Sequence, residues 1–115
     1  MKNITKATVK SIISRGGATF NKNGERVSLK SGYQVSKKDL VVLPITQMNK
    51  FIIKELLKRI ILRGEYLGVW VHEGLAYIDI SCRTKTKKEA LRMGKEYNQI
   101  SVLRWRDGSC IMVEG

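Results

Sequence analysis

The chain has 115 residues, of which 43% are hydrophobic and 7% aromatic, a composition typical of one folded domain rather than of a disordered segment. Its 22 lysine and arginine residues exceed the 10 acidic ones, giving a net charge of +12 that favours an anionic partner such as nucleic acid, a nucleoprotein or an acidic protein surface. Two isolated cysteines exclude a disulfide framework, and no apolar run approaches the roughly 20 residues that cross a bilayer.

The amino-terminal segment is predicted to form a helix over residues 3–15. Thr5 can cap its first turn, and Gly16 can end it. Its apolar stripe consists of Val9, Ile12 and Ile13. The segment has no uninterrupted apolar stretch of the kind found in a secretory signal, so we expect a cytoplasmic protein with reduced thiols at Cys82 and Cys110.

The next segment is predicted to be a hairpin. Asn23-Gly24 is a strong signal for a tight turn, and strand-forming residues lie on either side of it at 18–20 and 26–29. A second turn at Ser31-Gly32 leads into a short strand at 33–35.

A short apolar run precedes the only proline, Pro44. Residues 37–39 are charged and are predicted to form a polar loop. The run at 40–43 is either a strand or an anchoring segment, and we favour the strand.

The segment from Thr46 to Gly64, TQMNKFIIKELLKRIILRG, is predicted to be the central helix of the domain. It lies between Pro44 and a glycine, the usual punctuation of a helix. About 18 residues would span about 27 Å. The apolar positions that share one helical face, against which we expect the rest of the chain to pack, are Ile52, Ile53, Leu56, Leu57 and Ile60.

The carboxy-terminal half contains the clearest strand signals. EYLGVWVHEGLAYIDIS, residues 65–81, is rich in β-branched and aromatic residues on both sides of His72-Glu73-Gly74 and is predicted to be a hairpin. Thr86 and Glu89 form a capping box that opens a third helix, which Asn98 is predicted to end. The elements that follow are strands at 100–105 and 110–113 around an Asp107-Gly108 turn.

These elements predict a single α+β domain over residues 1–115, with three helices, antiparallel hairpins and the order α-ββ(β)-α-ββ-α-ββ. We expect an N-terminal helix and hairpin subregion at 1–45 and a compact helix–hairpin–helix–hairpin unit at 46–115. The helices of that unit are expected to cover one face of its sheet.

Residues that could support catalysis are sparse. The single histidine, His72, is predicted to lie at a hairpin turn, and one histidine with two isolated cysteines cannot form a zinc-type cluster. Phosphate-loop, dinucleotide and nucleophile-elbow motifs are absent from the sequence. We therefore expect a protein that is not an enzyme and that has no cofactor and no metal site.

Basic residues form the candidate binding site. The predicted central helix places lysines at four-residue intervals, and a second basic run opens the third helix; the latter is either a binding element or a solubilising loop. Because a hairpin returns the chain to its starting point, we expect the two groups to form one continuous cationic surface. Its members are Lys50, Lys54, Lys58, Arg83, Lys85, Lys87 and Lys88.

Arg104-Trp105-Arg106 places an indole between two guanidinium groups. In a strand both arginines would point away from the tryptophan. The triplet is then either a nucleic-acid platform that combines phosphate contacts with stacking, or a core tryptophan with arginines on the solvent side.

Three segments carry a resemblance: ITKATVKSII, GVWVHEGLAYIDIS, and NQISVLRW after the third predicted helix. Together they cover about half of the chain and are similar to small accessory proteins of phages and plasmids in Gram-positive bacteria, among them anti-CRISPR proteins against type II effectors. The resemblance rests on hydrophobic patterning and assigns no site residues. It implies a protein of a mobile genetic element that inhibits a CRISPR effector nuclease or its guide RNA complex in the bacterial cytoplasm.

The alternative function is a sequence-tolerant DNA- or RNA-binding module or a regulator of phage genes. Either function would be served by the basic surface, and neither requires a membrane.

Overall fold

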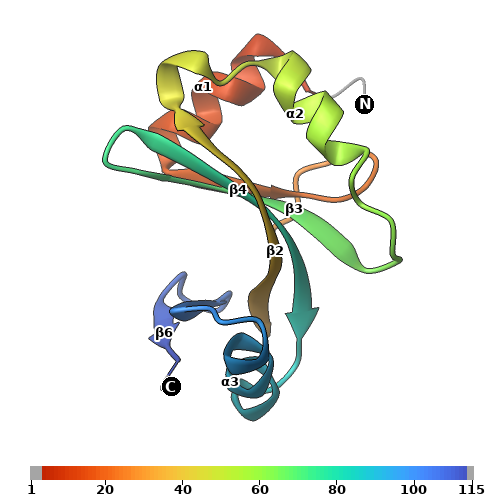
Figure 1. The fold of residues 1–115 in the computed structure, drawn as a ribbon, viewed down its shortest axis with the longest axis vertical. Helices are drawn as coiled ribbons and strands as arrows, with labels where there is room; N and C mark the ends of the chain where they lie inside the picture. Colours follow the sequence, from red (N-terminus) through yellow and green to blue (C-terminus); the bar gives the residue numbers. More distant parts are fainter. Residues whose placement is uncertain (1–3, 114–115) are drawn as a thin grey trace.

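The computed structural model describes residues 4–113 and shows a mixed α+β fold built on one six-stranded antiparallel sheet, with the strand order β1-β3-β4-β2-β5-β6 (Figure 1). The predicted fold class and element order are confirmed. The elements are α1 (Lys6–Arg15), β1 (Gly17–Phe20), β2 (Tyr33–Pro44), a 3-10 turn (Ile45–Gln47), α2 (Lys50–Leu57), β3 (Glu65–His72), β4 (Leu75–Thr84), α3 (Lys87–Glu96), β5 (Ser101–Arg104) and β6 (Cys110–Met112).

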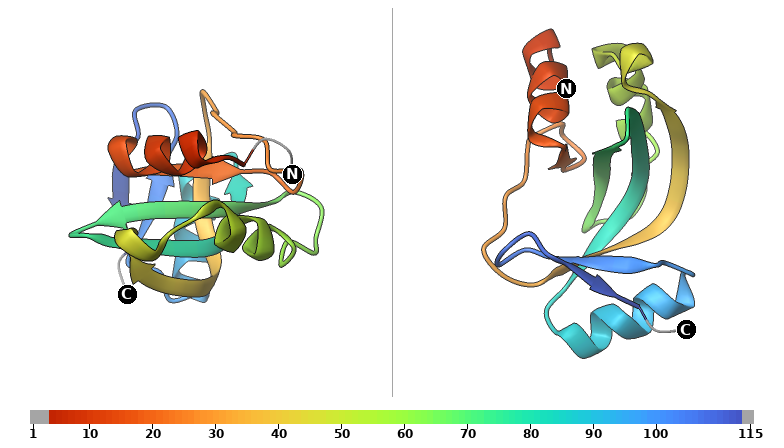
Figure 2. Two further views of the ribbon diagram at one scale, coloured as in Figure 1. Left: turned by 90° about the horizontal axis from the view of Figure 1, so that it is seen from above. Right: turned by 90° about the vertical axis from the view of Figure 1, so that its left-hand side faces the viewer.

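The sheet carries two hydrophobic cores at its two ends. The first lies between the sheet and helices α1 and α2, and the second lies between α3 and the β5–β6 hairpin (Figures 1 and 2). Along β4, Ile78 and Ile80 pack into the first core, and Cys82, two residues further on the same face, packs against the second. The three helices therefore cover one face of the sheet, the inner face, as expected for the helices of residues 46–115.

Strand β2 joins the two cores. It supplies Val35 to the second core and Leu43 to the first, and its pairing with β4 shifts register between Ser36 and Lys38 and again between Asp39 and Val41. Residues 37–39, predicted to be a loop, are therefore the bulged middle of one long strand. Bulges bend a strand and increase its twist, so a single strand can serve both ends of the molecule. The packing follows these two cores rather than a division at residue 45.

The predicted hairpin around Asn23-Gly24 is wrong in its second arm. Only an isolated bridge joins Phe20 to Arg26, and β1 instead pairs with β3. Segment 21–32 connects β1 to β2, which are separated in the sheet by β3 and β4. Ser31 accepts a hydrogen bond from Arg83 of β4, a residue on the sheet face opposite the helices. The connection therefore crosses this outer face.

The predicted 18-residue central helix is also corrected. Helix α2 ends at Leu57, and the next three residues continue as short-range turns in which each amide bonds three residues back. The Glu65 carboxylate accepts a hydrogen bond from the Leu62 amide at 3.0 Å, which holds the chain in a turn where a helix would run straight on. Ile60 lies beyond the end of α2 yet is only 3% exposed. The apolar pattern therefore identified a buried residue correctly, although that residue is not in the helix.

The remaining predicted elements are confirmed, except that Trp105 lies in the turn after β5 and not in a strand. Thr5 caps α1 and Gly16 ends it in the left-handed conformation, while Asn3 lies outside the described residues. Glu73 and Gly74 both have positive φ angles, 50° and 78°, as a two-residue type I′ turn requires. Thr86 caps α3. In residues 4–113 no helix has the length and apolar character needed to cross a membrane.

We expect Leu57→Ala to lower the free energy of unfolding by about 2–5 kcal/mol, because Leu57 is 1% exposed in the first core. Leu56→Ala is the matched control on the same helix. Leu56 is only partly buried, so its truncation should cost less. Denaturant titration of both variants checks this prediction, and an equal or larger loss for Leu56 would contradict the orientation of α2.

Candidate nucleic-acid and partner-binding surfaces

A cluster of cations covers α3 and the turn before it. We call it the α3 surface; its members are Lys85, Lys87, Lys88, Arg92 and Lys95. All five side chains are exposed, and within residues 4–113 only Arg92 has a carboxylate partner, Glu96 at 3.5 Å. Lys87 and Lys88 lie in the first turn of α3, where positive charge is opposed by the helix dipole. Their placement costs some stability, which is mild support for a binding role.

The α3 surface borders a groove of about 520 Å³ between α3 and β6. The residues that line it are Lys87, Leu91, Arg92, Lys95, Ile111, Met112 and Val113. Both apolar side chains and cations thus line the groove. Gly94 allows α3 to lie close to Val102 of β5 and to Val113, since a Cβ at position 94 would lie 2.8 Å from Val113 Cγ2 and 3.1 Å from Val102 Cγ1.

The lysines of α2 are in part engaged within the protein. Lys58 pairs with Glu55 at 2.9 Å, and the Lys50 ammonium lies over the Phe51 ring at 5.2 Å from its centroid. Lys54 is half-buried and has no carboxylate partner among the described residues.

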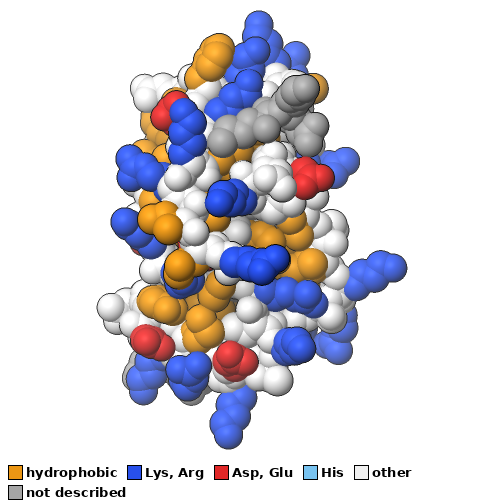
Figure 3. Space-filling view, turned by 90° about the vertical axis from the view of Figure 1, so that its right-hand side faces the viewer, with side chains coloured by type: hydrophobic (Ala, Val, Ile, Leu, Met, Phe, Trp, Pro, Cys, Tyr) orange, Lys and Arg blue, Asp and Glu red, His pale blue; other side chains and the backbone are white. Residues whose placement is uncertain are grey.

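The predicted continuity of the two basic groups is not observed. Helix α2 packs beside α1 at one end of the molecule, whereas α3 lies at the other end of its 37 Å longest axis (Figure 1). The hairpin does bring Glu65 beside Cys82, as the sequence suggested. Figure 3 shows the face that includes α2 and the chain after it, where lysine and arginine side chains are dispersed along the whole length between hydrophobic patches. The cations on this face are therefore dispersed and are not gathered into one patch.

The other predicted site residues differ in how many hydrogen bonds they form within the protein. Arg83 is exposed and donates to the backbone and hydroxyl oxygens of Ser31. Arg104 forms two hydrogen bonds with the Asp107 carboxylate, at 2.7 and 3.1 Å, and these bonds raise the pKa of Arg104 and lower that of Asp107. Arg106 is exposed.

Trp105 has an intermediate exposure, and its indole nitrogen is buried without a hydrogen-bond partner among the described residues. Its amide donates to the Gly32 carbonyl, which places it against segment 21–32. This backbone hydrogen bond ties the start of the β5–β6 turn to the end of segment 21–32.

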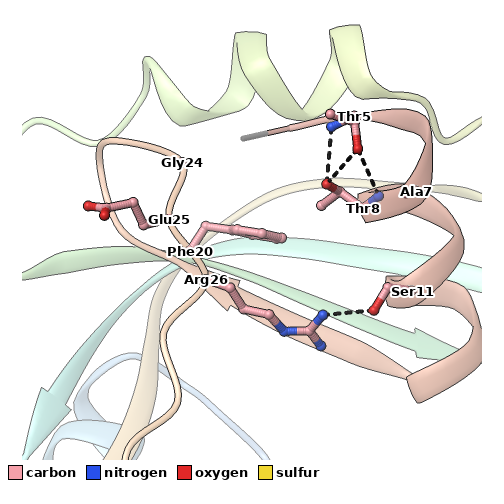
Figure 4. A pocket seen from close by; sticks show the side chains of 8 residues that line it. All are labelled: Thr5, Ala7, Thr8, Ser11, Phe20, Gly24, Glu25 and Arg26. Atoms are coloured by element: carbon pink, nitrogen blue, oxygen red, sulfur yellow. Dashed lines mark hydrogen bonds between the residues drawn. The ribbon is translucent and has the colours of Figure 1, made fainter. Parts of the chain in front are cut away.

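A second hollow, of about 440 Å³, lies between α1 and the turn at residues 21–26 (Figure 4). Thr5 and Thr8 form a reciprocal capping box, and Arg26 donates to the Ser11 hydroxyl at 2.9 Å and to the Gly17 carbonyl at 3.1 Å. Burial, together with nearby Arg15, lowers the pKa of Arg26. These polar groups stabilise local structure, so the hollow has no evident ligand chemistry.

The candidates for catalysis lie apart from one another. His72 ends β3 and is exposed, with Nε2 at 3.6 Å from the Glu73 carboxylate. Burial raises the pKa of the Cys82 thiol, which keeps it in its less nucleophilic form at neutral pH. Among residues 4–113 there is no group of three histidine, cysteine or acidic side chains that could hold a metal ion.

The sequence did not reveal a polar cluster on the outer face of the sheet. Thr19 donates to the Gln34 carbonyl oxygen at 3.0 Å, and the Gln34 amide donates to Ser81 at 2.7 Å. Gly68 makes room for these groups, because a Cβ there would lie 2.6 Å from Asp79 Oδ1 and 3.1 Å from Gln34 Nε2. An isolated glycine in a strand is a signal for such close approach.

Asp79 is the unusual member of this cluster. Burial and the Asp39 carboxylate directly across the strands raise the pKa of Asp79 to about 7. Its Oδ1 atom is buried without a hydrogen-bond partner among the described residues. Ionising it in place therefore costs free energy.

We expect stability to fall as the pH rises from about 4 to about 7, because the folded protein binds the Asp79 proton more tightly than the unfolded chain does. This loss of stability is absent only at pH values below the pKa that Asp79 has in the unfolded chain. Asp79→Asn should remove most of this slope and raise the free energy of unfolding at pH 8 by about 1–3 kcal/mol. Denaturant titrations at pH values between about 4 and 8 check this prediction. Asp39→Asn is expected to reduce the dependence of the unfolding free energy on pH only in part. An unchanged slope in Asp79→Asn would contradict the assignment.

The cationic groups and the polar cluster are thus the main features of the described surface. The chain matches no protein-family model, and no curated protein or solved structure matches it at a significant level.

Proposed function

We propose that this protein is a non-enzymatic binding protein of a mobile genetic element that engages a bacterial nucleoprotein, with inhibition of a type II CRISPR effector or its guide RNA complex as the specific form. The observation that carries the proposal is the α3 surface, where exposed cations flank an apolar groove with few carboxylates to neutralise them. Such a surface attracts phosphate groups over a range set by the ionic strength.

The α3 surface is preferred over the α2 lysines for two reasons. Within residues 4–113 only Arg92 among its cations has a carboxylate partner, whereas Lys50 and Lys58 already interact with Phe51 and Glu55. In addition, the groove offers apolar contacts beside the charges, which a base or an apolar side chain of a nucleoprotein could use.

We expect Lys87→Glu/Lys95→Glu to weaken binding to a guide RNA complex at least about tenfold at 100 mM salt, since each reversed cation removes a phosphate contact and adds repulsion. The slope of log affinity against log salt concentration should become shallower by about 2. Fluorescence anisotropy with a labelled complex measures both quantities.

Two matched variants with the same charge change serve as controls. Lys22→Glu/Lys30→Glu alters exposed lysines of segment 21–32 and should have only the weaker effect of net charge. Lys54→Glu/Lys58→Glu tests the α2 group separately. If the α2 variant loses affinity and the α3 variant does not, the binding surface has been assigned to the wrong end of the molecule.

The CRISPR proposal makes a separate prediction about activity. The protein should reduce cleavage of a matching DNA target by a type II effector loaded with guide RNA, and Lys87→Glu/Lys95→Glu should relieve this reduction. A protein that binds free RNA or DNA, with affinity that falls steeply between about 50 and 200 mM salt, and leaves cleavage unchanged would instead be the sequence-tolerant nucleic-acid-binding module.

A further inference from the structure

The outer face of the sheet carries an exposed row of aromatic and apolar side chains near the β3–β4 turn. Trp70 of β3 pairs across the strands with Tyr77 of β4, which pairs with Val42 of β2. Their exposed fractions are 52%, 37% and 53%. All three described helices pack on the opposite face, and segment 21–32 covers the outer face nearer to Arg83. This row is therefore an unpartnered part of the sheet.

The charges around the row differ from those of the rest of the protein. Residues 65–81 contain no lysine or arginine, and two of their three acids, Glu73 and Asp79, lie near the row, whereas Glu65 is paired with Lys37. In the next row of the outer face, Asp39 lies across from Asp79, and Glu73 lies in the turn beyond Trp70. On the opposite border, beyond β1, are Arg15 and Arg26, and Arg26 already donates to Ser11 and to the Gly17 carbonyl. The carboxylates thus lie on the β4, β2 and turn side of the row.

This arrangement discriminates between possible occupants. A nucleic acid would place phosphates near the Asp39 and Glu73 carboxylates and would be repelled. A second copy joined through the same face would bring two acidic borders together. A cationic protein segment meets neither penalty, and a guanidinium group can lie flat on an indole while it pairs with a neighbouring carboxylate.

From the juxtaposition of the Trp70–Tyr77–Val42 row with the Asp39 and Glu73 carboxylates, we infer that this face is a docking site for an arginine-bearing segment of a partner protein. The apolar row would contact the body of the segment, and the indole and carboxylates would bind its guanidinium groups. The site is distinct from the α3 surface and does not depend on the function proposed for it.

Nuclear magnetic resonance of the isotope-labelled full chain tests the inference. The probe is an Arg-Gly-Arg-Gly-Arg peptide with blocked ends, titrated alongside the matching Glu-Gly peptide and a short oligothymidylate. We expect the arginine peptide to shift the Trp70 indole signal and the amides of Tyr77 and Val42, while the other two leave them unchanged.

Substitutions locate the effect. Trp70→Ala should lower the affinity for the arginine peptide at least about fivefold, which is the size expected for loss of a cation–π contact. Trp70→Leu keeps an apolar side chain in the strand but lacks the ring, and it should weaken binding similarly if Trp70→Ala proves unstable. Asp39→Asn/Glu73→Gln should also weaken binding. Phe51→Ala, which truncates an exposed aromatic residue on α2, should leave it unchanged.

Several outcomes would overturn the inference. They are the absence of any shift with the arginine peptide, a shift of the Trp70 signal by oligothymidylate, and a dependence of that signal on protein concentration that matches dimer formation by sedimentation. Binding that survives both Trp70 variants in folded protein would also overturn it.

Discussion

The fold depends on one largely buried ion pair at the junction of its two cores. Lys37 Nζ lies 2.7 Å from Glu65 Oε2, and the two side chains are only 22% and 10% exposed. Lys37 sits at the first bulge of β2, and Glu65 is the first residue of β3 and also accepts a hydrogen bond from the Leu62 amide. One carboxylate therefore fixes the bend of β2, the start of β3 and the turn that leads into it. Burial alone would raise the pKa of Glu65, but the hydrogen bonds from Lys37 and the Leu62 amide lower it overall.

Such a pair determines geometry more than it adds stability. The attraction between buried charges is largely offset by the loss of their hydration, whereas removing one partner leaves an unpaired buried charge at a cost of about 3–5 kcal/mol. The bulged strand is thereby held in one register, with Val35 in the second core and Leu43 in the first. The position of α3, and of the groove beside it, follows from that register, since α3 packs against Val35.

Local sequence signals predicted the elements whose causes are local. The Thr5 cap, the Glu73-Gly74 turn and the Asn98 stop depend on side chains and backbone preferences within a few residues, and the structure confirms them. The errors arose where distant residues decide the conformation. Helix α2 ends at Leu57 and leads into turns in which the Glu65 carboxylate accepts a hydrogen bond from the Leu62 amide. Lys37, expected in a loop, lies at a bulge of β2, a strand that forms by pairing with the distant β4. The separation of the basic groups has the same origin, since the order of strands in the sheet sets where each helix lies.

For the candidate surfaces, too, some features could be predicted from local sequence and others depend on distant residues. The charged residues could be found from the sequence, but not which of them stay unpaired. Lys58 and Arg104 find acidic partners within their own turns, while Lys87 and Lys95 have none in the part of the chain that the structure describes. The Trp70–Tyr77–Val42 row could not be recognised either, because a strand alternates between two faces and the sequence does not say which one the helices cover.

The charge distribution links the two proposed surfaces. The protein has a net charge of +12, yet residues 65–81, which form most of the β3–β4 hairpin, contain no lysine or arginine. Basic charge is concentrated on the helices and on segment 21–32, and Asp39 and Asp79 lie beside the exposed aromatic row. A nucleoprotein presents both phosphates and the basic side chains that hold them. A compact protein whose α3 surface is cationic and whose exposed aromatic row has carboxylates on its border can meet both kinds of group at once, with each contact tested by variants that leave the other intact.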